Sequence, residues 1–260
     1  MKYDTIDVKN QFDFATVSLN RPDVHNAFNE KLIKELTNCF KELIKDKTIK
    51  CIILTGNGES FCAGADLKWM KSMANYSMDE NIKDSKNLQN LYETIYSCPK
   101  PVICKVNGNA FGGGLGLIAV CDIAIAKEDC KFAFSEVKLG IIPAVISPYV
   151  LRRIGLSNMK RLFITGERFD SNYAKEIGLV DFVSEDHELN EIVIKHVELL
   201  RSSGPESIKE IKRLADTYEK FDLENYKEFT IKKIAELRVS KEGQEGIGAY
   251  LEKRKPKWSE

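Results

Sequence analysis

The sequence predicts an α/β fold in which parallel strands alternate with helices, followed by a helical C-terminal region. Short runs rich in Ile and Val alternate with segments whose apolar residues recur at helical spacing, a pattern typical of βαβ units. Helical patterns dominate beyond Gly140, and Ser203-Gly204-Pro205 is the clearest break in that half. We therefore expect a core over residues 1–203 and a helical oligomerisation region over residues 204–260.

The elements of the core follow from local patterns. Residues 6–8 and 14–19 alternate or run apolar on either side of a polar break, which predicts a pair of strands. Asn29 is a suitable N-cap for a helix, because apolar residues recur at helical spacing from Leu32 to Ile44. The other predicted elements are strands over 51–54, 102–106 and 123–126 and helices over 67–73, 79–96 and 115–121.

The second half is predicted to be mostly helical. The helices cover residues 147–154, 158–164, 171–177, 189–200, 206–218, 223–239 and 243–253, with one strand over 179–183. Pro205 suits the first position of the helix that follows it. The helix from Leu223 carries more apolar and aromatic residues than a solvated terminal helix needs, so we expect it to pack on the core or on another subunit.

Composition excludes several classes of protein. The chain has 39 basic residues (Lys and Arg) and 39 acidic residues (Asp and Glu). Its net charge is therefore zero, which gives no reason to expect nucleic acid or a membrane surface as a partner. The seven cysteines lie mostly in apolar runs without a CxxC pair, which disfavours metal sites and disulfides and favours a reducing compartment. The N-terminus shows no signal or transit pattern, and no apolar run of about 18 residues occurs. We expect a cytoplasmic protein without a metal.

Two glycine-rich turns carry the most informative chemistry. Phe61–Leu67 and Asn109–Leu117 each follow an apolar run and precede a helical pattern. Small residues leave backbone N–H groups uncovered, and two such turns can direct two donors at one oxygen, as a developing enolate or oxyanion requires. These turns predict chemistry at an acyl carbonyl.

Other catalytic patterns do not fit. No Lys-Ser/Thr follows the glycines as in a Walker A motif, and no GxGxxG opens a helix with an acidic residue about 20 positions on. Without GxSxG, and with only three histidines (His25, His187 and His196), a serine hydrolase is also disfavoured. We expect these histidines to be structural or surface residues rather than catalytic ones.

Several motifs follow one another along nearly the whole chain. They are Leu19-Asn20-Arg21-Pro22, Ser60–Leu67, Lys100-Pro101-Val102, Gly112-Gly113-Gly114, Cys121–Ala124, Phe134–Pro143, Glu245-Gly246 and Glu252–Arg254. Through these motifs the chain resembles the enoyl-CoA hydratase/isomerase (crotonase) family. The resemblance implies a crotonase-like spiral of ββα units whose C-terminal helices assemble trimers or hexamers. It also implies an acyl-CoA thioester as substrate, with CoA part of that substrate and no separate cofactor.

The resemblance also implies roles for particular residues. The thioester oxygen would lie between the backbone N–H groups of Ala65 and Gly113, and Glu136 would be the acid/base group. Burial beside an acyl group would move the pKa of Glu136 toward neutrality. The residues implied in substrate and CoA binding are His25, Ala63, Ala65, Asp66, Leu67, Lys68, Gly113 and Gly114, with Lys68 able to reach a phosphate.

Gly116 departs from the family pattern, because two-carboxylate hydratases carry a second glutamate at this position. Glycine has no acid/base chemistry, so here it would make room instead. Three functions stay open. Similarity to bacterial hydratases acting on 3-methylglutaconyl-CoA or carboxygeranoyl-CoA, in the segment Ala144–Tyr149 and around Gly116, favours hydration of a branched or carboxylated enoyl-CoA. A double-bond isomerase using one glutamate is the alternative. A non-catalytic acyl-CoA-binding protein is the third, and the presence of Glu136 argues against it.

Overall fold

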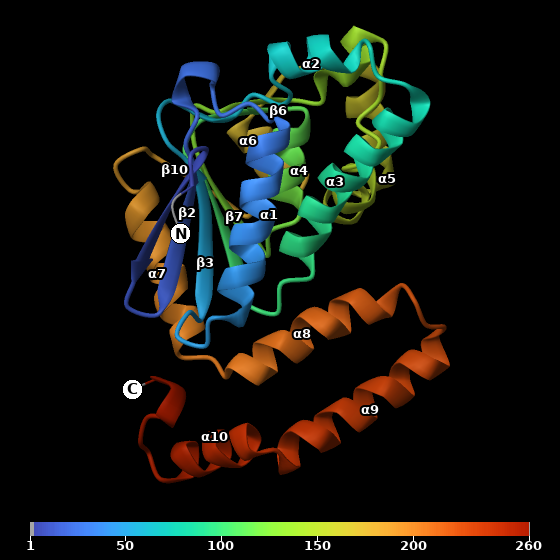
Figure 1. Ribbon diagram of the computed structural model, residues 1–260. Helices are drawn as coiled ribbons and strands as arrows, with labels where there is room; N and C mark the ends of the chain where they lie inside the picture. The colour runs from blue at the N-terminus through green and yellow to red at the C-terminus, as the bar shows by residue number, and fades with distance from the viewer. Residues whose placement is uncertain (1–2, 260) are drawn as a thin grey trace. The chain divides into compact units, whose positions relative to one another are not determined.

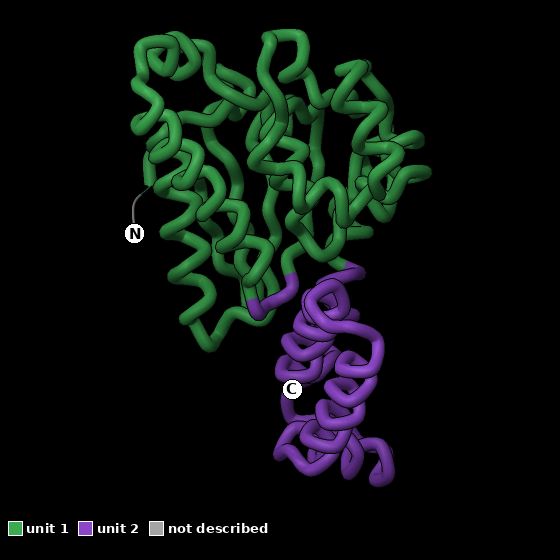
Figure 2. Tube along the Cα trace, turned by 90° about the vertical axis from the view of Figure 1, so that its right-hand side faces the viewer, with its two compact units in different colours: residues 1–98, 102–194 green, residues 99–101, 195–260 purple. Residues whose placement is uncertain are grey.

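The computed structural model describes residues 3–259, which divide into two compact units (Figure 2). The first unit holds the residues up to Cys98 together with Val102–Ile194. The second holds Pro99–Pro101 and the residues from Lys195 onward.

The strands belong to the first unit and form two sheets. They are β1 (Ile6–Gln11), β2 (Phe14–Leu19), β3 (Cys51–Gly56), β4 (Ser60–Cys62), β5 (Val102–Val106), β6 (Asn109–Phe111), β7 (Ile123–Lys127), β8 (Lys131–Ala133), β9 (Phe169–Asp170) and β10 (Phe182–Ser184). Among the described residues, one sheet has the order β1-β2-β3-β5-β7-β10 and the other has the order β4-β6-β8-β9. From β2 to β10 the neighbours in the larger sheet are parallel, which confirms the predicted α/β class.

Helices connect the strands and continue to the C-terminus (Figure 1). The α-helices are α1 (Glu30–Lys45), α2 (Leu67–Met73), α3 (Met78–Tyr96), α4 (Gly113–Ala119), α5 (Ser147–Thr165), α6 (Ser171–Glu176), α7 (Leu189–Arg201), α8 (Pro205–Tyr218), α9 (Leu223–Val239) and α10 (Lys241–Leu251). The short 3-10 helices are η1 (Pro22–Val24), η2 (Ser135–Leu139) and η3 (Lys257–Ser259).

Helix α1 shows how the sequence determines a local element. The Asn29 side chain accepts a hydrogen bond from the Leu32 amide at 2.9 Å, so the predicted N-cap is confirmed. Leu32, Leu36 and Phe40 are fully buried and pack α1 into the core of the first unit. At about 25 cal/mol for each Å² of apolar surface buried, each such side chain contributes roughly 1.5–3 kcal/mol.

The long elements match the predicted ranges to within a few residues, and the differences lie in the short strands. The three-residue strands β4, β6 and β8 were not predicted, and the glycine turns follow β4 and β6 rather than the longer strands β3 and β5. The two helices predicted over 147–164 are confirmed: both lie within α5, and Gly155, whose φ of 74° and ψ of 164° are not helical, separates them. The strand predicted over 179–183 begins only at Phe182.

The cysteines behave as apolar core residues. All seven are free and buried. Burial raises the pKa of the Cys51, Cys62 and Cys130 thiols to about 12. In the part of the chain that the structure describes, no helix is long and apolar enough to cross a membrane.

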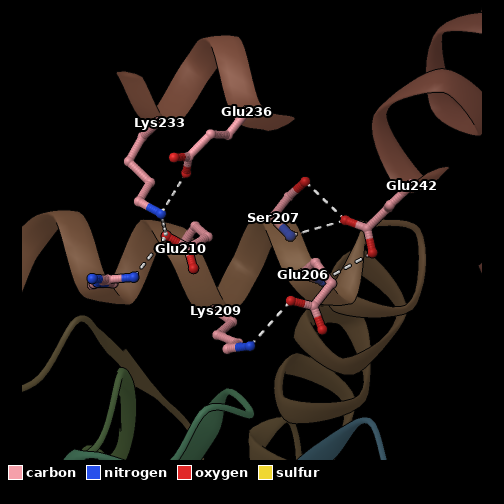
Figure 3. Close-up of polar contacts among 8 residues, drawn as sticks. Glu206, Ser207, Lys209, Glu210, Lys233, Glu236 and Glu242 are labelled. Carbon is pink, nitrogen blue, oxygen red and sulfur yellow. Dashed lines mark hydrogen bonds and ion pairs between the residues drawn. The ribbon is translucent and has the colours of Figure 1, made fainter. Parts of the chain in front are cut away.

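The second unit contains α8, α9 and α10, and a carboxylate from α10 organises it (Figure 3). Glu242 accepts hydrogen bonds from the amides of Glu206 and Ser207, each at 2.9 Å, which satisfies free donors at the start of α8. Pro205 occupies the first turn of α8 as predicted. Lys233 of α9 lies 3.2 Å from a Glu210 carboxylate oxygen of α8. These contacts tie the three helices together.

The helix from Leu223 presents apolar side chains outward within this unit. Leu223, Ile231 and Val239 of α9 are exposed, as are Tyr250 and Leu251 at the end of α10. Large exposed apolar side chains on neighbouring helices are typical of surfaces through which soluble proteins associate.

Candidate active site

Three predicted functional groups lie at one edge of the smaller sheet. β4 pairs in parallel with β6, and β6 pairs in parallel with β8. The carboxyl ends of parallel neighbours share an edge, where ligands bind in many α/β proteins. Ala65 follows β4, Gly113 follows β6 and Glu136 follows β8. The fold therefore brings together these three residues, which are up to 71 positions apart in the sequence.

The Ala65 amide is a free donor at this edge. An isolated parallel bridge joins Ala65 to Phe28: the Phe28 amide donates to the Gly64 carbonyl at 2.6 Å, and the Asp66 amide donates to the Phe28 carbonyl at 2.9 Å. A parallel bridge of this type uses the groups that flank Ala65, so the Ala65 N–H faces away from Phe28. Over residues 3–259 it donates to no protein acceptor, and Ala65 is exposed.

The Gly113 amide is the second donor. Gly113 is the first residue of α4, and first-turn amides have no acceptor within their own helix. Gly112 precedes it at φ 50° and ψ −123°, a conformation that favours glycine, and donates to the Ala133 carbonyl at 2.9 Å. A Cβ on Gly114 would lie 2.5 Å from the Cys62 carbonyl oxygen. Glycine at 114 therefore allows the second turn to contact the end of β4.

Glu136 lies beside the peptide that carries the Gly113 N–H. A Cβ built on Gly112 would lie 2.9 Å from Glu136 Oε1, so the carboxyl group packs against the Gly112 α-carbon. Glu136 Oε2 is buried and has no hydrogen-bond partner among the described residues. Burial raises the pKa of Glu136, as expected from the sequence. A partly desolvated carboxyl group next to a free amide can move a proton where an oxyanion forms.

Gly116 makes room for two side chains. A Cβ at this position would lie 2.3 Å from Ile146 Cγ2 and 2.9 Å from two ring atoms of Tyr92. The Tyr92 hydroxyl donates to the Gly113 carbonyl at 2.8 Å, which holds the first turn of α4 in place. The space that a second carboxylate would take is therefore filled by Tyr92 and Ile146.

The Asp66 side chain holds the first glycine turn. Its Oδ1 accepts hydrogen bonds from the amides of Lys68 and Trp69, and its Oδ2 lies 2.7 Å from an Arg21 guanidinium nitrogen. Burial raises the pKa of Asp66, but the bonds from Arg21 and the two amides outweigh it and leave the pKa below its usual value. Arg21 also donates to the Ala27 carbonyl. The Asp66 side chain therefore positions the first glycine turn, and a role for Asp66 in binding CoA stays a prediction.

The other residues predicted to bind substrate or CoA differ in exposure and in hydrogen bonding. Leu67 and Lys68 are exposed at the start of α2, and Lys68 forms no ion pair within the described part of the chain. The Ala63 amide donates to the His25 carbonyl at 2.9 Å, and the His25 ring lies 3.0 Å from Ser60 Oγ. Gly114 is buried. Roles for these residues in binding CoA stay predictions.

We expect Arg21→Met to destabilise the protein by about 2–3 kcal/mol, because it leaves the Asp66 carboxylate buried without its counter-ion. The side chains are 17% and 8% exposed, which places the effect below that of a fully buried pair. Urea denaturation at neutral pH measures the change.

Lys209→Met is the matched control, because it breaks an exposed ion pair with Glu206 and should change stability by less than about 1 kcal/mol.

The pH dependence of stability gives a second test. Asp66 has a lowered pKa when folded, so its contribution to stability is present above the unfolded pKa and is lost as pH falls through the folded pKa. Arg21→Met should therefore differ least from the natural protein in acid. An equal loss of stability in Arg21→Met at every pH would contradict the ion pair between Arg21 and Asp66.

The sequence did not reveal the roles of Tyr92, Ile146 and Arg21. Tyr92 was only one residue of the helix predicted over 79–96, and Arg21 was part of a motif without an assigned partner. A glycine inside a helix pattern at 116 was the one available signal, since it indicates a close neighbour but not which one.

Comparison with known proteins shows what the chain is similar to. The enoyl-CoA hydratase/isomerase family model matches residues 10–260. A crystal structure of an enoyl-CoA hydratase from Shewanella pealeana has a TM-score of 0.96 and 38% identity, covering 99% of this chain and 97% of that one. A Legionella pneumophila structure assigned as an enoyl-CoA hydratase/isomerase (crotonase) has a TM-score of 0.92 and 44% identity, covering 98% of both chains. The short-chain-enoyl-CoA hydratase of Clostridium acetobutylicum is 31% identical over 98% of this chain and 97% of its own length.

Proposed function

This chain belongs to the enoyl-CoA hydratase/isomerase family, and we propose that it hydrates the double bond of an enoyl-CoA thioester with Glu136 as the only acid/base side chain. The observation that carries the proposal is the meeting of Ala65, Gly113 and Glu136 at one sheet edge. Two free amides beside one partly buried carboxyl group suit a reaction in which negative charge builds on a thioester oxygen.

In the proposed reaction, the thioester oxygen accepts hydrogen bonds from the Ala65 and Gly113 amides. Glu136 takes a proton from water as the water oxygen bonds to the β-carbon, and the C=C electron pair moves toward the thioester oxygen. Glu136 then returns the proton to the α-carbon, so water is added and the enzyme is regenerated. The reaction transfers no electrons, and we propose that no cofactor besides the CoA of the substrate takes part.

The filled space at Gly116 determines which substrate we propose. With Tyr92 and Ile146 in contact there, no second carboxylate from α4 can hold the water. A polar group on the acyl chain would help Glu136 to orient it. We therefore propose a branched or carboxylated enoyl-CoA, as in leucine or terpenoid catabolism, with a subtype like the methylglutaconyl-CoA and carboxygeranoyl-CoA hydratases.

The second candidate is isomerisation of 3-enoyl-CoA to 2-enoyl-CoA. The same observation favours it, because moving one proton from C2 to C4 needs a single carboxylate and no bound water. A purely acyl-CoA-binding protein would not require a carboxyl group with a raised pKa beside two free donors.

Turnover of a small substrate panel distinguishes these functions. We expect kcat/KM for hydration of 3-methylglutaconyl-CoA to exceed that for crotonyl-CoA by about tenfold, which corresponds to one charge-assisted hydrogen bond. We expect no turnover of the free acids, since binding of CoA supplies the energy that positions the reacting carbons. Efficient double-bond migration in 3-hexenoyl-CoA without hydration of either enoyl-CoA would establish the isomerase instead.

We also propose that the chain assembles as a trimer or hexamer. The support is the exposed apolar surface of α9 and α10, including Ile231 and Tyr250, which no residue of the second unit covers within the described part of the chain. Buried in an interface, that surface would stabilise association.

A further inference from the structure

A groove of about 420 Å³ runs between α3 and the start of α5. Its lining combines an apolar side with an amide and hydroxyl rim: Met78, Asn81, Ile82, Ser85, Lys86, Gln89, Ala144, Val145 and Pro148. The two helices lie side by side in Figure 1, since Tyr149 of α5 donates to Glu93 of α3 at 2.9 Å. Both elements that form the groove belong to the first unit.

Residues near the groove lining contact the candidate active site. Gln89 and Tyr92 are three residues apart on one face of α3, and Tyr92 bonds the Gly113 carbonyl. Ile146 follows Val145 directly and contacts Gly116. Both walls of the groove therefore converge on α4 within about one helical turn of the Gly113 donor. The groove therefore lies beside the elements that hold the Gly113 donor in place.

The lining of the groove carries positive charge and no negative charge. Lys86 is its only charged residue, and no carboxylate lines it. Lys86 is exposed and forms no ion pair with any residue between 3 and 259. It lies six residues before Tyr92 on α3, or about 9 Å along the helix at 1.5 Å per residue. A ligand with an apolar body and an anionic far end fits this arrangement.

We infer that this groove binds the acyl chain and that the Lys86 ammonium pairs with a carboxylate at its distal end. This inference rests on the proposed function, because it requires the thioester at Ala65 and Gly113. It makes Lys86 a specificity-determining residue that selects dicarboxylic acyl-CoA substrates over neutral ones of the same length.

Binding of two saturated ligands tests the inference without turnover. Calorimetric titration gives the dissociation constants of adipoyl-CoA and of its terminal amide, and their ratio cancels the shared contribution of CoA. Lys86→Glu is expected to lower the preference for adipoyl-CoA about five- to tenfold, and Lys86→Met by a smaller factor. Lys83→Glu, which changes an exposed α3 lysine outside the groove, should leave the preference within twofold of the natural protein.

The result that overturns the inference is an equal preference in the natural protein and in Lys86→Glu, or the same loss in Lys83→Glu. Failure of the proposed reaction would show differently: adipoyl-CoA would bind with the Lys86-dependent preference while none of the enoyl-CoA substrates was turned over. Absence of binding by both ligands would overturn the inference as well.

Discussion

Glu136→Gln is expected to lower kcat/KM for the best enoyl-CoA substrate by about 10²- to 10⁴-fold, the usual contribution of a positioned acid/base group. The amide keeps the shape of the carboxyl group that packs against Gly112, so substrate binding should persist. Steady-state kinetics gives kcat/KM, and titration with a saturated acyl-CoA gives the dissociation constant. Glu128→Gln removes an exposed carboxylate and serves as the control. Activity of Glu136→Gln within a few-fold of the natural protein would refute the assignment.

The raised pKa of Glu136 predicts two further effects, one on the pH profile of activity and one on the stability of Glu136→Gln. The base must be ionised, so the acid limb of the pH profile of kcat/KM should lie above the 4.5 of an ordinary glutamate. A raised folded pKa means that the native state binds the proton more tightly. Its stabilising contribution is present below the unfolded pKa and is lost as pH rises through the folded pKa. Glu136→Gln should therefore melt higher than the natural protein at neutral pH, and the difference should shrink toward pH 4.

Gly116→Glu is expected to destabilise the protein by several kcal/mol, enough to deplete the folded state, and not to create a second catalytic carboxylate. Its Cβ alone would lie 2.3 Å from Ile146 Cγ2, and overpacking of this kind costs about 1–3 kcal/mol. The carboxylate would add the cost of an unpaired buried charge, which is again several kcal/mol. A typical domain has only about 5–15 kcal/mol of stability, so little folded protein should remain.

Milder variants keep this prediction measurable. Gly116→Ala should lose about 1–3 kcal/mol in urea denaturation. The loss in Gly116→Ala combined with Ile146→Ala should be smaller than the sum of the two single losses, because the two side chains compete for one space. Gly248→Ala is the control: its Cβ would meet nothing within 4 Å in α10, so alanine should be neutral or stabilise by up to about 1 kcal/mol. Additive losses in the double variant would contradict the contact between Gly116 and Ile146.

The sequence predicted the long elements because helical and strand periodicity extends over many residues in them. The strands β4, β6 and β8 have three residues each, too few for any periodicity, and they form the sheet edge that carries the site. Ala65, Gly113 and Glu136 could be named only by resemblance, since no local pattern distinguishes a free amide from a paired one.

Tyr92 and Ile146 show more clearly what the sequence alone does not predict. Each is an ordinary apolar residue in its own segment, and their contact at Gly116 exists only after α3, α4 and α5 have packed. Likewise, the ion pair between Arg21 and Asp66 joins residues 45 positions apart. Long-range contacts of this kind have no signature in a single sequence.

The burial of Cys62 has a chemical consequence for an enzyme that handles unsaturated thioesters. Such compounds are Michael acceptors, and a thiolate near the bound double bond would add to the β-carbon and alkylate the enzyme. Cys62 lies three residues before Ala65, yet it is fully buried, and burial raises the pKa of its thiol to about 12. Only the thiolate is a strong nucleophile, so this cysteine is protected against its own substrate by its protonation and its inaccessibility.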